Sequence, residues 1–265
     1  MIKNKFNNKL ILIVLCILII FIILKHNYNK ICKKVDYTKT VKYLNTNFII
    51  KFLFSNKLIS KLCQFYTYNN FVYENKNILN KVKEYDFVID IGANVGALGL
   101  LIIKKSKCKL YYGFEPNLNN YIALKENFEI NKKHLSNTKY NLINMGVSKE
   151  KRIMVYDDNS TQTTLENFKN KIEVNTLDNL IKINYQPNRT FIKIDVEGME
   201  LDVLIGMKDI INKYKPDIVL EINPISWSLF LGQKNDKSKI LSILDEYHYN
   251  IEKISIKDYF CKPKF

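Results

Sequence analysis

The chain has 265 residues, of which 47% are hydrophobic, and a formal net charge of +15. Residues 1–83 carry fifteen lysines against two acids, whereas residues 84–265 carry twenty-six basic residues against twenty-four acids. The length is that of one sizeable globular domain with additional segments. The near-neutral larger part excludes a broad phosphate-binding surface there, so we expect no nucleic-acid partner.

The first predicted element is an unbroken apolar run, LILIVLCILIIFIIL, at residues 10–24. As a helix it would be about 22 Å long, shorter than the roughly 30 Å hydrocarbon core of a bilayer. Lys9 and Lys25 flank the run and can extend to the two interfaces, and the bilayer can thin locally. The segment that follows, KHNYNK, lacks the small residues of a signal-peptidase site. We therefore expect residues 1–25 to form an uncleaved single-pass membrane anchor.

Lysines are more numerous after this run than before it. The positive-inside rule then favours the main domain on the cytosolic rather than the lumenal side of the membrane. Residues 26–83 are basic and aromatic, with hydrophobic stretches such as FIIKFLF at 48–54. We predict that this region forms one or two helices leading into the main domain. Its lysines could contact anionic headgroups, although an ordinary solvated helical face explains them equally well.

From residue 84 onward, short apolar runs alternate with helical stretches. Strands are predicted at 86–92, 109–116, 140–147, 190–198, 217–224 and 249–256. Helices are predicted at 94–106, 117–131, 199–214 and 236–247. Residues 152–178 look irregular, with two short extended pieces. The alternation predicts an α/β domain over residues 84–265, with a mostly parallel sheet covered by helices on both faces.

The stretch VIDIGANVG at 88–96 joins the first of these strands to the first helix. Gly92 and Gly96 bracket the turn and allow the backbone to approach a ligand closely. Asp90 lies at the strand end, and Glu115 ends the second strand, nineteen residues after Gly96. An acid in that second position can accept hydrogen bonds from both hydroxyls of a ribose. In a parallel sheet these strand ends form the ligand crevice, so the pattern predicts a site for an adenosine-containing cofactor.

The glycine spacing bears on which cofactor is bound. A dinucleotide fingerprint is G-x-G-x-x-G, which places a pyrophosphate on a helix N-terminus. Here the spacing is G-x-x-x-G-x-x-G, with Asn94 in the middle of the turn. The acid immediately before the turn would repel a pyrophosphate and suits a ligand with a cationic end. This favours S-adenosylmethionine, with a nicotinamide cofactor as the alternative.

Three carboxylates, those of Asp195, Glu197 and Glu200, crowd the segment DVEGME after a central strand. Glu197 and Glu200 lie at the beginning of a helix, where acids are favoured by up to about 1 kcal/mol each, which easily accounts for one of them but poorly for Asp195. We therefore predict that one of the three is a catalytic base that accepts a proton from a hydroxyl. In a less favoured alternative, Asp195 and Glu197 hold a divalent cation together with Glu221 from the next strand.

Six blocks of the sequence occur in a familiar order: VIDIGANVG (88–96), GFEPN (113–117), NMGVS (144–148), TLDNL (176–180), IKIDVEGMELDVLIGM (192–207) and PDIVLEINP (216–224). They resemble the FkbM family of S-adenosylmethionine-dependent methyltransferases. The resemblance implies a class I methyltransferase fold, which is Rossmann-like and has a seven-stranded sheet with one antiparallel strand near its edge. It also implies O-methylation, typically of a sugar or other small-molecule hydroxyl.

The resemblance also assigns roles to residues of the predicted cofactor site. Asp90, Gly92, Asn94 and Gly96 are expected to surround the methionine part of the cofactor. Glu115 is expected to bind the ribose, with Asn117 close by, and Met145 and Gly146 to border the adenine. The function predicted is a membrane-tethered O-methyltransferase that acts on a hydroxyl-bearing small molecule, glycan or glycolipid. The alternative is a catalytically silent, methyltransferase-like binding module anchored to a membrane.

Overall fold

The computed structural model describes residues 35–54, 71–156, 170–181, 189–222 and 237–264. The predicted membrane anchor at residues 1–25 lies outside these residues. Within the part of the chain that the structure describes, none of the helices has the length and apolar character needed to span a bilayer. The chain divides into two compact units, one of residues 1–37 and 53–69 and the other of residues 38–52 and 70–265. The second unit contains the central sheet and the helices that follow it.

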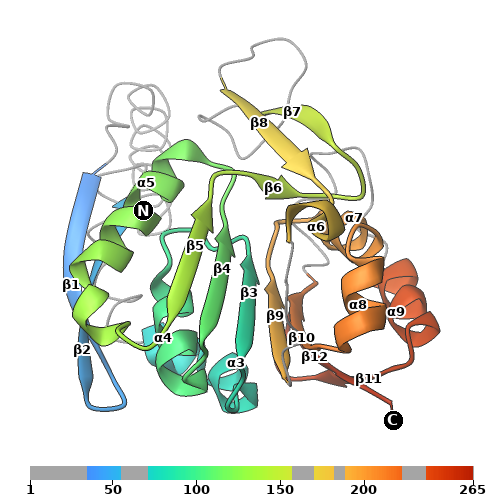
Figure 1. Cartoon of the computed structure of the whole chain (residues 1–265), viewed down its shortest axis with the longest axis horizontal. Coiled ribbons are helices and arrows are strands. Elements are labelled where there is room, and N and C mark those ends of the chain that lie inside the picture. Colours follow the sequence, from blue (N-terminus) through green and yellow to red (C-terminus); the bar gives the residue numbers. More distant parts are fainter. Residues whose placement is uncertain (1–34, 55–70, 157–169, 182–188, 223–236, 265) are drawn as a thin grey trace, which may run out of the picture. The chain divides into compact units, whose positions relative to one another are not determined.

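A seven-stranded sheet forms the centre of this unit (Figure 1). In chain order its strands are β3 (Phe87–Ile91), β4 (Leu110–Phe114), β5 (Lys139–Ile143), β9 (Thr190–Ile194), β10 (Asp217–Glu221), β11 (Tyr249–Lys253) and β12 (Asp258–Pro263). Their order in the sheet is β11-β12-β10-β9-β3-β4-β5. Strands β10, β9, β3, β4 and β5 pair in parallel, whereas β12 runs antiparallel to both of its neighbours. This confirms the predicted mostly parallel sheet with one antiparallel strand near its edge.

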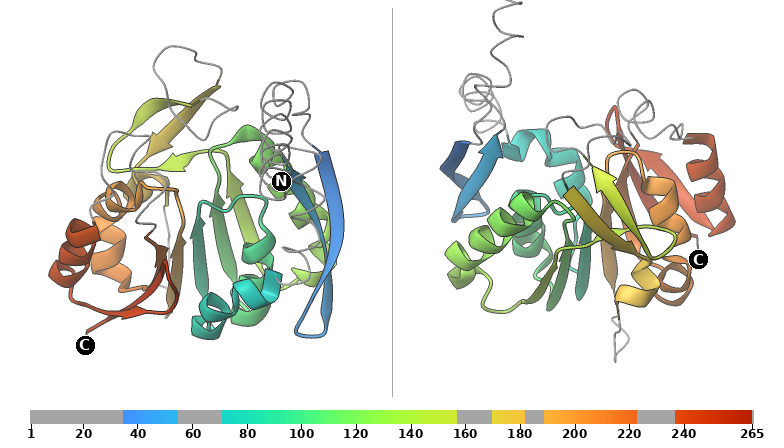
Figure 2. Two further views of the ribbon diagram at one scale, coloured as in Figure 1. Left: turned by 180° about the vertical axis from the view of Figure 1, so that it is seen from behind. Right: turned by 90° about the horizontal axis from the view of Figure 1, so that it is seen from above.

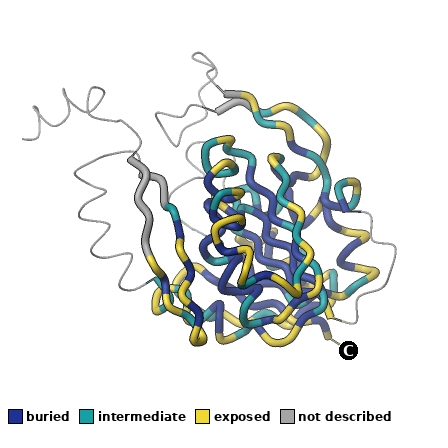
Figure 3. The backbone as a smooth tube through the Cα atoms, turned by 60° about the vertical axis from the view of Figure 1, so that its left-hand side comes forward, coloured by how far each residue is buried: buried dark blue, intermediate teal, exposed yellow. Residues whose placement is uncertain are grey.

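Helices cover the sheet on both faces, as Figure 2 shows from above. They are α3 (Lys76–Lys81), α4 (Ala97–Ser106), α5 (Leu118–Ile130), α6 (Leu177–Leu180), α7 (Glu200–Ile205), α8 (Lys208–Tyr214) and α9 (Lys237–Glu246). On β3, the side chains of Phe87, Ile89 and Ile91 pack in one core with residues of α7, α8 and α9. The alternate residue Asp90 faces the other way, toward α4, where its carboxylate lies close to Gly99. Figure 3 shows the central strands as the most buried part of the chain.

A second, smaller sheet lies beyond the carboxyl ends of β3, β4 and β5 (Figure 1). It consists of β6 (Gly146–Val147), β7 (Arg152–Tyr156) and β8 (Asn170–Asn175), in the order β6-β8-β7. The sequence predicted only short extended pieces in an irregular segment here. In the structure these pieces are paired strands. Strand β8 pairs with β7 in an antiparallel ladder and with β6 in a parallel one.

Among the described residues of 26–83 the structure has the helix α3, and it has two strands where a further helix was predicted. These strands are β1 (Val35–Tyr43) and β2 (Thr46–Phe54), which form a two-stranded sheet. Within the second unit, β2 alternates buried Phe48 and Ile50 with exposed Asn47 and Ile49, and this period of two fits a strand with one covered face. The helical prediction was wrong here because it weighed hydrophobic content above the period.

Asparagine side chains in α5 and at its C-cap form hydrogen bonds with the backbone of β2. Asn131 accepts from the Ile49 N–H (2.9 Å) and donates to the Ile49 carbonyl (2.6 Å). Asn127 accepts from the Lys51 N–H (2.6 Å) and donates to the Lys51 carbonyl (2.8 Å). The two amides therefore substitute for a neighbouring strand and attach β2 to α5.

Two further predictions need correction at the C-terminal half of the domain. The single helix predicted at 199–214 is two short helices, α7 and α8, which are separated at Gly206 and Met207. A Cβ at Gly206 would lie 2.0 Å from the Ser148 carbonyl oxygen, so the chain bends where the backbone after β6 passes. Strand β12 was not predicted, and its five buried residues cover the outer side of β10.

Candidate active site

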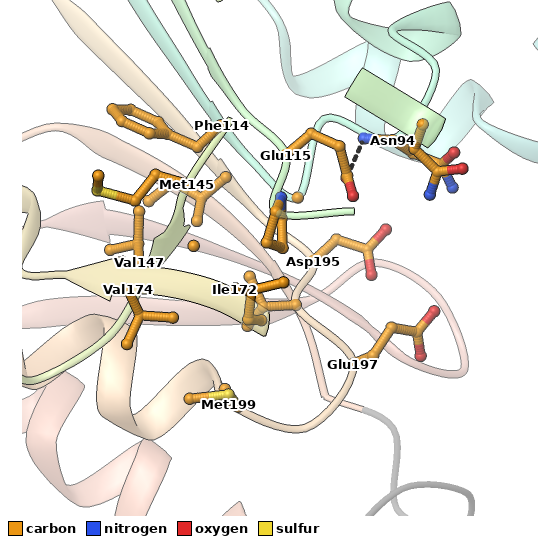
Figure 4. Close-up of a pocket in the computed structure, with 16 residues that line it drawn as sticks. Asn94, Phe114, Glu115, Met145, Val147, Ile172, Val174, Asp195, Glu197 and Met199 are labelled. Atoms are coloured by element: carbon orange, nitrogen blue, oxygen red, sulfur yellow. Dashed lines mark hydrogen bonds between the residues drawn. The ribbon is translucent and has the colours of Figure 1, made fainter. Parts of the chain in front are cut away.

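A cavity of about 340 Å³ opens at the carboxyl ends of β3, β4 and β9. Its volume falls in the range of small-molecule sites. Figure 4 shows apolar side chains gathered on one side of it and the carboxylates of Glu115, Asp195 and Glu197 on the other. The predicted residues that line it are Gly92, Asn94, Glu115, Met145, Gly146, Asp195 and Glu197. The sequence therefore located the cavity, and the roles of these residues in it remain predictions.

The turn between β3 and α4 forms one rim of the cavity. Gly92 has φ +80°, Asn94 φ +51° and Gly96 φ +79°. A Cβ at Gly92 would lie 1.8 Å from the carbonyl oxygen of Asp195, so only glycine fits where these two strand ends meet. Gly96 does not line the cavity but precedes the first residue of α4, where it packs against Leu124 and Phe128.

Glu115 is held at the end of β4 by two backbone donors. Its carboxylate accepts from the Asn94 N–H (2.9 Å) and the Asn117 N–H (2.9 Å), the first of which is drawn in Figure 4. Burial raises the pKa of this carboxyl above its ordinary value, and the two N–H donors oppose that rise. These bonds, together with one from the Asn120 side chain, fix the carboxylate in the cavity, where it keeps acceptor capacity for a ligand hydroxyl.

Asn117 lies next to this carboxylate but does not line the cavity. Its side chain accepts from the N–H groups of Asn119 (3.0 Å) and Asn120 (3.2 Å), which caps the first turn of α5. Asn120 lines the cavity in its place. Asn117 therefore positions Glu115 and α5 rather than facing the ligand.

The apolar side of the cavity comes from two sheets. Phe114 is the last residue of β4 and Met145 lies just after β5, both in the central sheet region. Val147, Ile172 and Val174 come from the small sheet (Figure 4). Gly146 between them leaves room, because a Cβ there would lie 2.8 Å from the Val174 side chain. The sequence located Met145 and Gly146 but not the contribution of β8, which is distant along the chain.

Asp90 was predicted to face the cofactor, and the structure places it elsewhere. It is 1% exposed and absent from the cavity wall. Its carboxylate accepts from the Tyr111 hydroxyl (2.8 Å) and forms an ion pair with Lys193 Nζ (3.1 Å). The physical reason is the alternation of side chains along β3, which turns Asp90 toward α4. Lys193 balances the charge of Asp90 inside the protein, so this charge does not repel a pyrophosphate as the sequence predicted.

The loop after β9 carries the two carboxylates that reach the cavity, those of Asp195 and Glu197. Glu197 has φ +54°, which is unusual for a residue with a side chain, and Gly198 follows with φ +106°. Loss of hydration and repulsion by Asp195 and Glu221 raise the pKa of Glu197 to about 7. Left-handed backbone at a non-glycine residue is typical of functional sites, where the surrounding structure holds a strained conformation. Glu197 can therefore exchange a proton near neutral pH.

The two remaining predicted acids, Glu200 and Glu221, do not line the cavity. Glu200 is buried and accepts from the N–H groups of Gly198 (3.1 Å) and Val196 (3.4 Å), so it shapes the loop. Glu221 pairs with Lys257 Nζ (2.6 Å). Burial and Asp195 raise the pKa of Glu221, and Lys257 opposes this.

These placements bear on the predicted metal alternative. Among the described residues, no group of three or more His, Cys, Asp or Glu side chains is arranged to hold a metal ion. In the proposed set of Asp195, Glu197 and Glu221, the carboxylate of Glu221 is already bound by an ammonium group. This arrangement favours Glu197 as a base over a divalent cation site.

Lys193 is the charged residue that the sequence analysis missed. It lies in the buried strand β9, and its Nζ donates to the Gly92 carbonyl (2.8 Å). The sequence contains a sign of this buried ion pair, because a lysine within the apolar run TFIKI is costly to bury unless it is paired.

The cavity fits the cofactor that the sequence predicts. Glu115 offers acceptors for ribose hydroxyls, and the apolar side suits a flat purine. Asp195 places a carboxylate on the cavity wall that can face a cationic group. The turn at Gly92 lets the backbone approach the ligand without a side chain in between.

Comparisons with known proteins address the same region. A family model described as the methyltransferase FkbM domain matches residues 90–251. No curated protein matches the sequence. Among solved structures, the methyltransferase FkbM from Methylobacillus flagellatus KT is 21% identical, with a TM-score of 0.49. The match covers 66% of this chain and 43% of that one, so the chain spans less than half the length of that protein.

Two other solved structures are similar at lower identity. Precorrin-6y C5,15-methyltransferase from Geobacter metallireducens GS-15 is 14% identical, with a TM-score of 0.41, over 73% of this chain and 88% of that one. Magnesium protoporphyrin IX methyltransferase from Synechocystis PCC 6803, with bound SAM, is 9% identical, with a TM-score of 0.44, over 74% and 81%. Family membership is established by the family model, which matches more than half of the chain.

Proposed function

The chain belongs to the FkbM methyltransferase family, and from this premise we propose that it transfers a methyl group from S-adenosylmethionine to a hydroxyl of a sugar or other small molecule. The observation that carries the proposal is the presence of two features in one cavity. Glu115 and the apolar wall form a nucleoside-type site, and Glu197 adds a carboxylate whose pKa is raised to about 7.

The residues divide the binding work by chemistry. Glu115, fixed by the N–H groups of Asn94 and Asn117, would accept the ribose hydroxyls. Met145, Gly146 and the small sheet would enclose the adenine. Gly92 and Asn94 would border the methionine part at the turn after β3. Each of these residues except Asn117 lines the cavity.

A hydroxyl acceptor needs a base, because its oxygen must lose a proton when it bonds to carbon. When bound, the cofactor supplies a methyl group on a sulfonium. Glu197 would accept the hydroxyl proton, since its raised pKa keeps it a competent base at neutral pH. Glu200 would act indirectly, by holding the backbone of the loop that carries Glu197.

The test uses the full-length chain, purified in detergent. We expect it to bind S-adenosylhomocysteine in calorimetry and to transfer a labelled methyl group to a member of a panel of glycans and small hydroxyl compounds. Glu197→Gln should lower the transfer rate by about 10² to 10⁴ while leaving the dissociation constant for S-adenosylhomocysteine unchanged. Glu129→Gln, on the surface of α5, is the matched control and should behave as wild type.

Two results would contradict the proposal. Binding without transfer to any acceptor supports the alternative of a catalytically silent binding module. Full transfer activity in Glu197→Gln removes this residue as the base.

The membrane tether and the cellular location are also part of the proposal. The apolar run at residues 10–24 supports a single-pass anchor, and the lysines after it support a cytosolic catalytic domain. The full-length chain should remain with membranes after alkaline carbonate extraction. Release of the chain into the soluble fraction would contradict the anchor.

A further inference from the structure

Lys193 occupies an unusual place for a charged side chain. It lies in β9, in the middle of the sheet, and is 5% exposed. In the parallel register between β3 and β9 it is the direct partner of Asp90. Side chains of such cross-strand partners lie on the same face of a sheet, which places both residues on the side covered by α4.

The Lys193 ammonium contacts three groups from two strand ends and the turn. It donates to the Gly92 carbonyl (2.8 Å), pairs with the Asp90 carboxylate (3.1 Å) and lies 3.6 Å from Asp195 Oδ2. Burial alone would lower the pKa of Lys193, but Asp90 and Asp195 raise it above its ordinary value. The Lys193 ammonium is therefore charged, and two of the groups that it contacts, the Gly92 carbonyl and the Asp195 carboxylate, border the cavity.

Two of these three partners belong to the cavity wall, and Lys193 itself does not. Gly92 and Asp195 both line the cavity, and their backbones are in close contact, as the crowding at Gly92 shows. The Asp195 side chain is 35% exposed, so its orientation depends on what holds it. Among the described residues, the Asp195 carboxylate forms its ion pair with Lys193 alone.

We propose that Lys193 is a positioning residue of the cofactor site, which fixes the Gly92 carbonyl and orients the Asp195 carboxylate toward the bound cofactor. This inference rests on the proposed function. Its competitor is a purely structural role, in which Lys193 only neutralises the buried Asp90. The two differ in one respect, because a neutralising lysine becomes dispensable once Asp90 loses its charge.

The experiment therefore compares two variants of the full-length chain that differ only at residue 193. Asp90→Asn keeps the acceptor for the Tyr111 hydroxyl and leaves Lys193 paired with Asp195 and Gly92. Asp90→Asn with Lys193→Met removes the ammonium without leaving the Asp90 charge buried alone. The measurements are the dissociation constant for S-adenosylhomocysteine by calorimetry, well below the melting temperature of both variants, and the melting temperature itself.

We expect the double variant to bind S-adenosylhomocysteine at least tenfold more weakly than Asp90→Asn, although both are folded. Equal dissociation constants would show that Lys193 only balances Asp90 and would overturn the proposal. If the double variant does not fold, Asp90→Asn with Lys193→Gln replaces it, because glutamine keeps a donor but no charge. A tenfold loss is expected there too, and unchanged affinity again overturns the proposal.

Lys105→Met is the matched control. Lys105 also donates to a backbone carbonyl, that of Leu79, but does so away from the cavity. Its removal should leave the dissociation constant unchanged. If wild-type protein fails to bind S-adenosylhomocysteine at all, the proposed function fails first, so the two failures are distinguishable.

Discussion

The acids near β3 and β4 and the acids on the loop after β9 differ in how the surrounding protein binds them. Asp90 within β3 is bound by Lys193 and Tyr111, and Glu115 directly after β4 is bound by two backbone N–H groups. After β9, Glu197 lies on a strained loop beside Asp195, and its pKa is raised to about 7.

We call Asp90, Glu115, the turn at Gly92 and the groups that bind them the framework, and we call the loop that carries Asp195 and Glu197 the reactive edge. Carboxylates that are paired or multiply hydrogen-bonded are held in one charge state and one position. A carboxylate that is crowded by like charges can change its proton state with little cost near neutral pH. Under the proposed function, the acids near β3 and β4 would fix the geometry of the site, and Glu197 on the loop after β9 would exchange the proton.

The largest effect should come from breaking the framework at Gly92. Gly92→Ala puts a Cβ 1.8 Å from the Asp195 carbonyl oxygen at φ +80°. We expect a loss of about 3 kcal/mol or more in the free energy of unfolding, measured in urea, and loss of S-adenosylhomocysteine binding. Ala93→Gly in the same turn should cost only about 1 kcal/mol and retain binding. Equal stability of Gly92→Ala and wild type would contradict the packing described.

The reactive edge should show itself in the pH dependence of methyl transfer. Glu197 must be deprotonated to act as a base, so the rate should rise about tenfold per pH unit below pH 7 and level off above it. The measurement is kcat/KM against pH with a fixed acceptor. Glu197→Gln should flatten the profile. A wild-type profile that is flat from about pH 5 to 8 would exclude this group as the base.

A third prediction tests whether the hydrogen bonds between β2 and α5 stabilise the framework. The buried Asn127 amide joins the Lys51 backbone of β2 and donates to the Val95 carbonyl in the cofactor turn (2.8 Å). Asn127→Ala leaves these groups without partners and should cost about 2 kcal/mol of unfolding free energy. Asn212→Ala, exposed on α8, should cost nothing measurable. If Asn127→Ala has the same free energy of unfolding as wild type, the sheet of β1 and β2 is not part of the framework.

The smallest effect should be a gain in stability at the reactive edge. Glu197→Asn suits the left-handed backbone better and removes a charge, so we expect the free energy of unfolding to rise by about 0.5 to 1 kcal/mol. Because the folded-state pKa of Glu197 lies above its ordinary 4.5, its ionisation destabilises the fold as pH rises from there through about 7. The gain should therefore be larger at pH 8 than at pH 5. Transfer activity should fall, and a stable, fully active variant would contradict the assignment.

Much of the fold could be predicted from local pattern. Strands β3, β4, β5, β9 and β10 and helices α4 and α5 follow from apolar runs and helical spacing, and the turn at Gly92 from its glycines. The errors have physical causes. The hairpin of β1 and β2 was missed because its alternation was read as hydrophobic content, and β12 because no pattern marked it as a partner of β10.

The position of the ligand cavity follows from the order of strands along the chain, because parallel strands place Gly92, Glu115 and Asp195 at one edge whatever their exact register. Which acids face that cavity depends on three-dimensional packing. Asp90 and Lys193 are paired because the register of β3 on β9 places them side by side on one face. Glu197 faces the cavity because the loop after β9 takes a left-handed turn. Side-chain direction depends on contacts between segments about a hundred residues apart, and no local pattern in the chain encodes them.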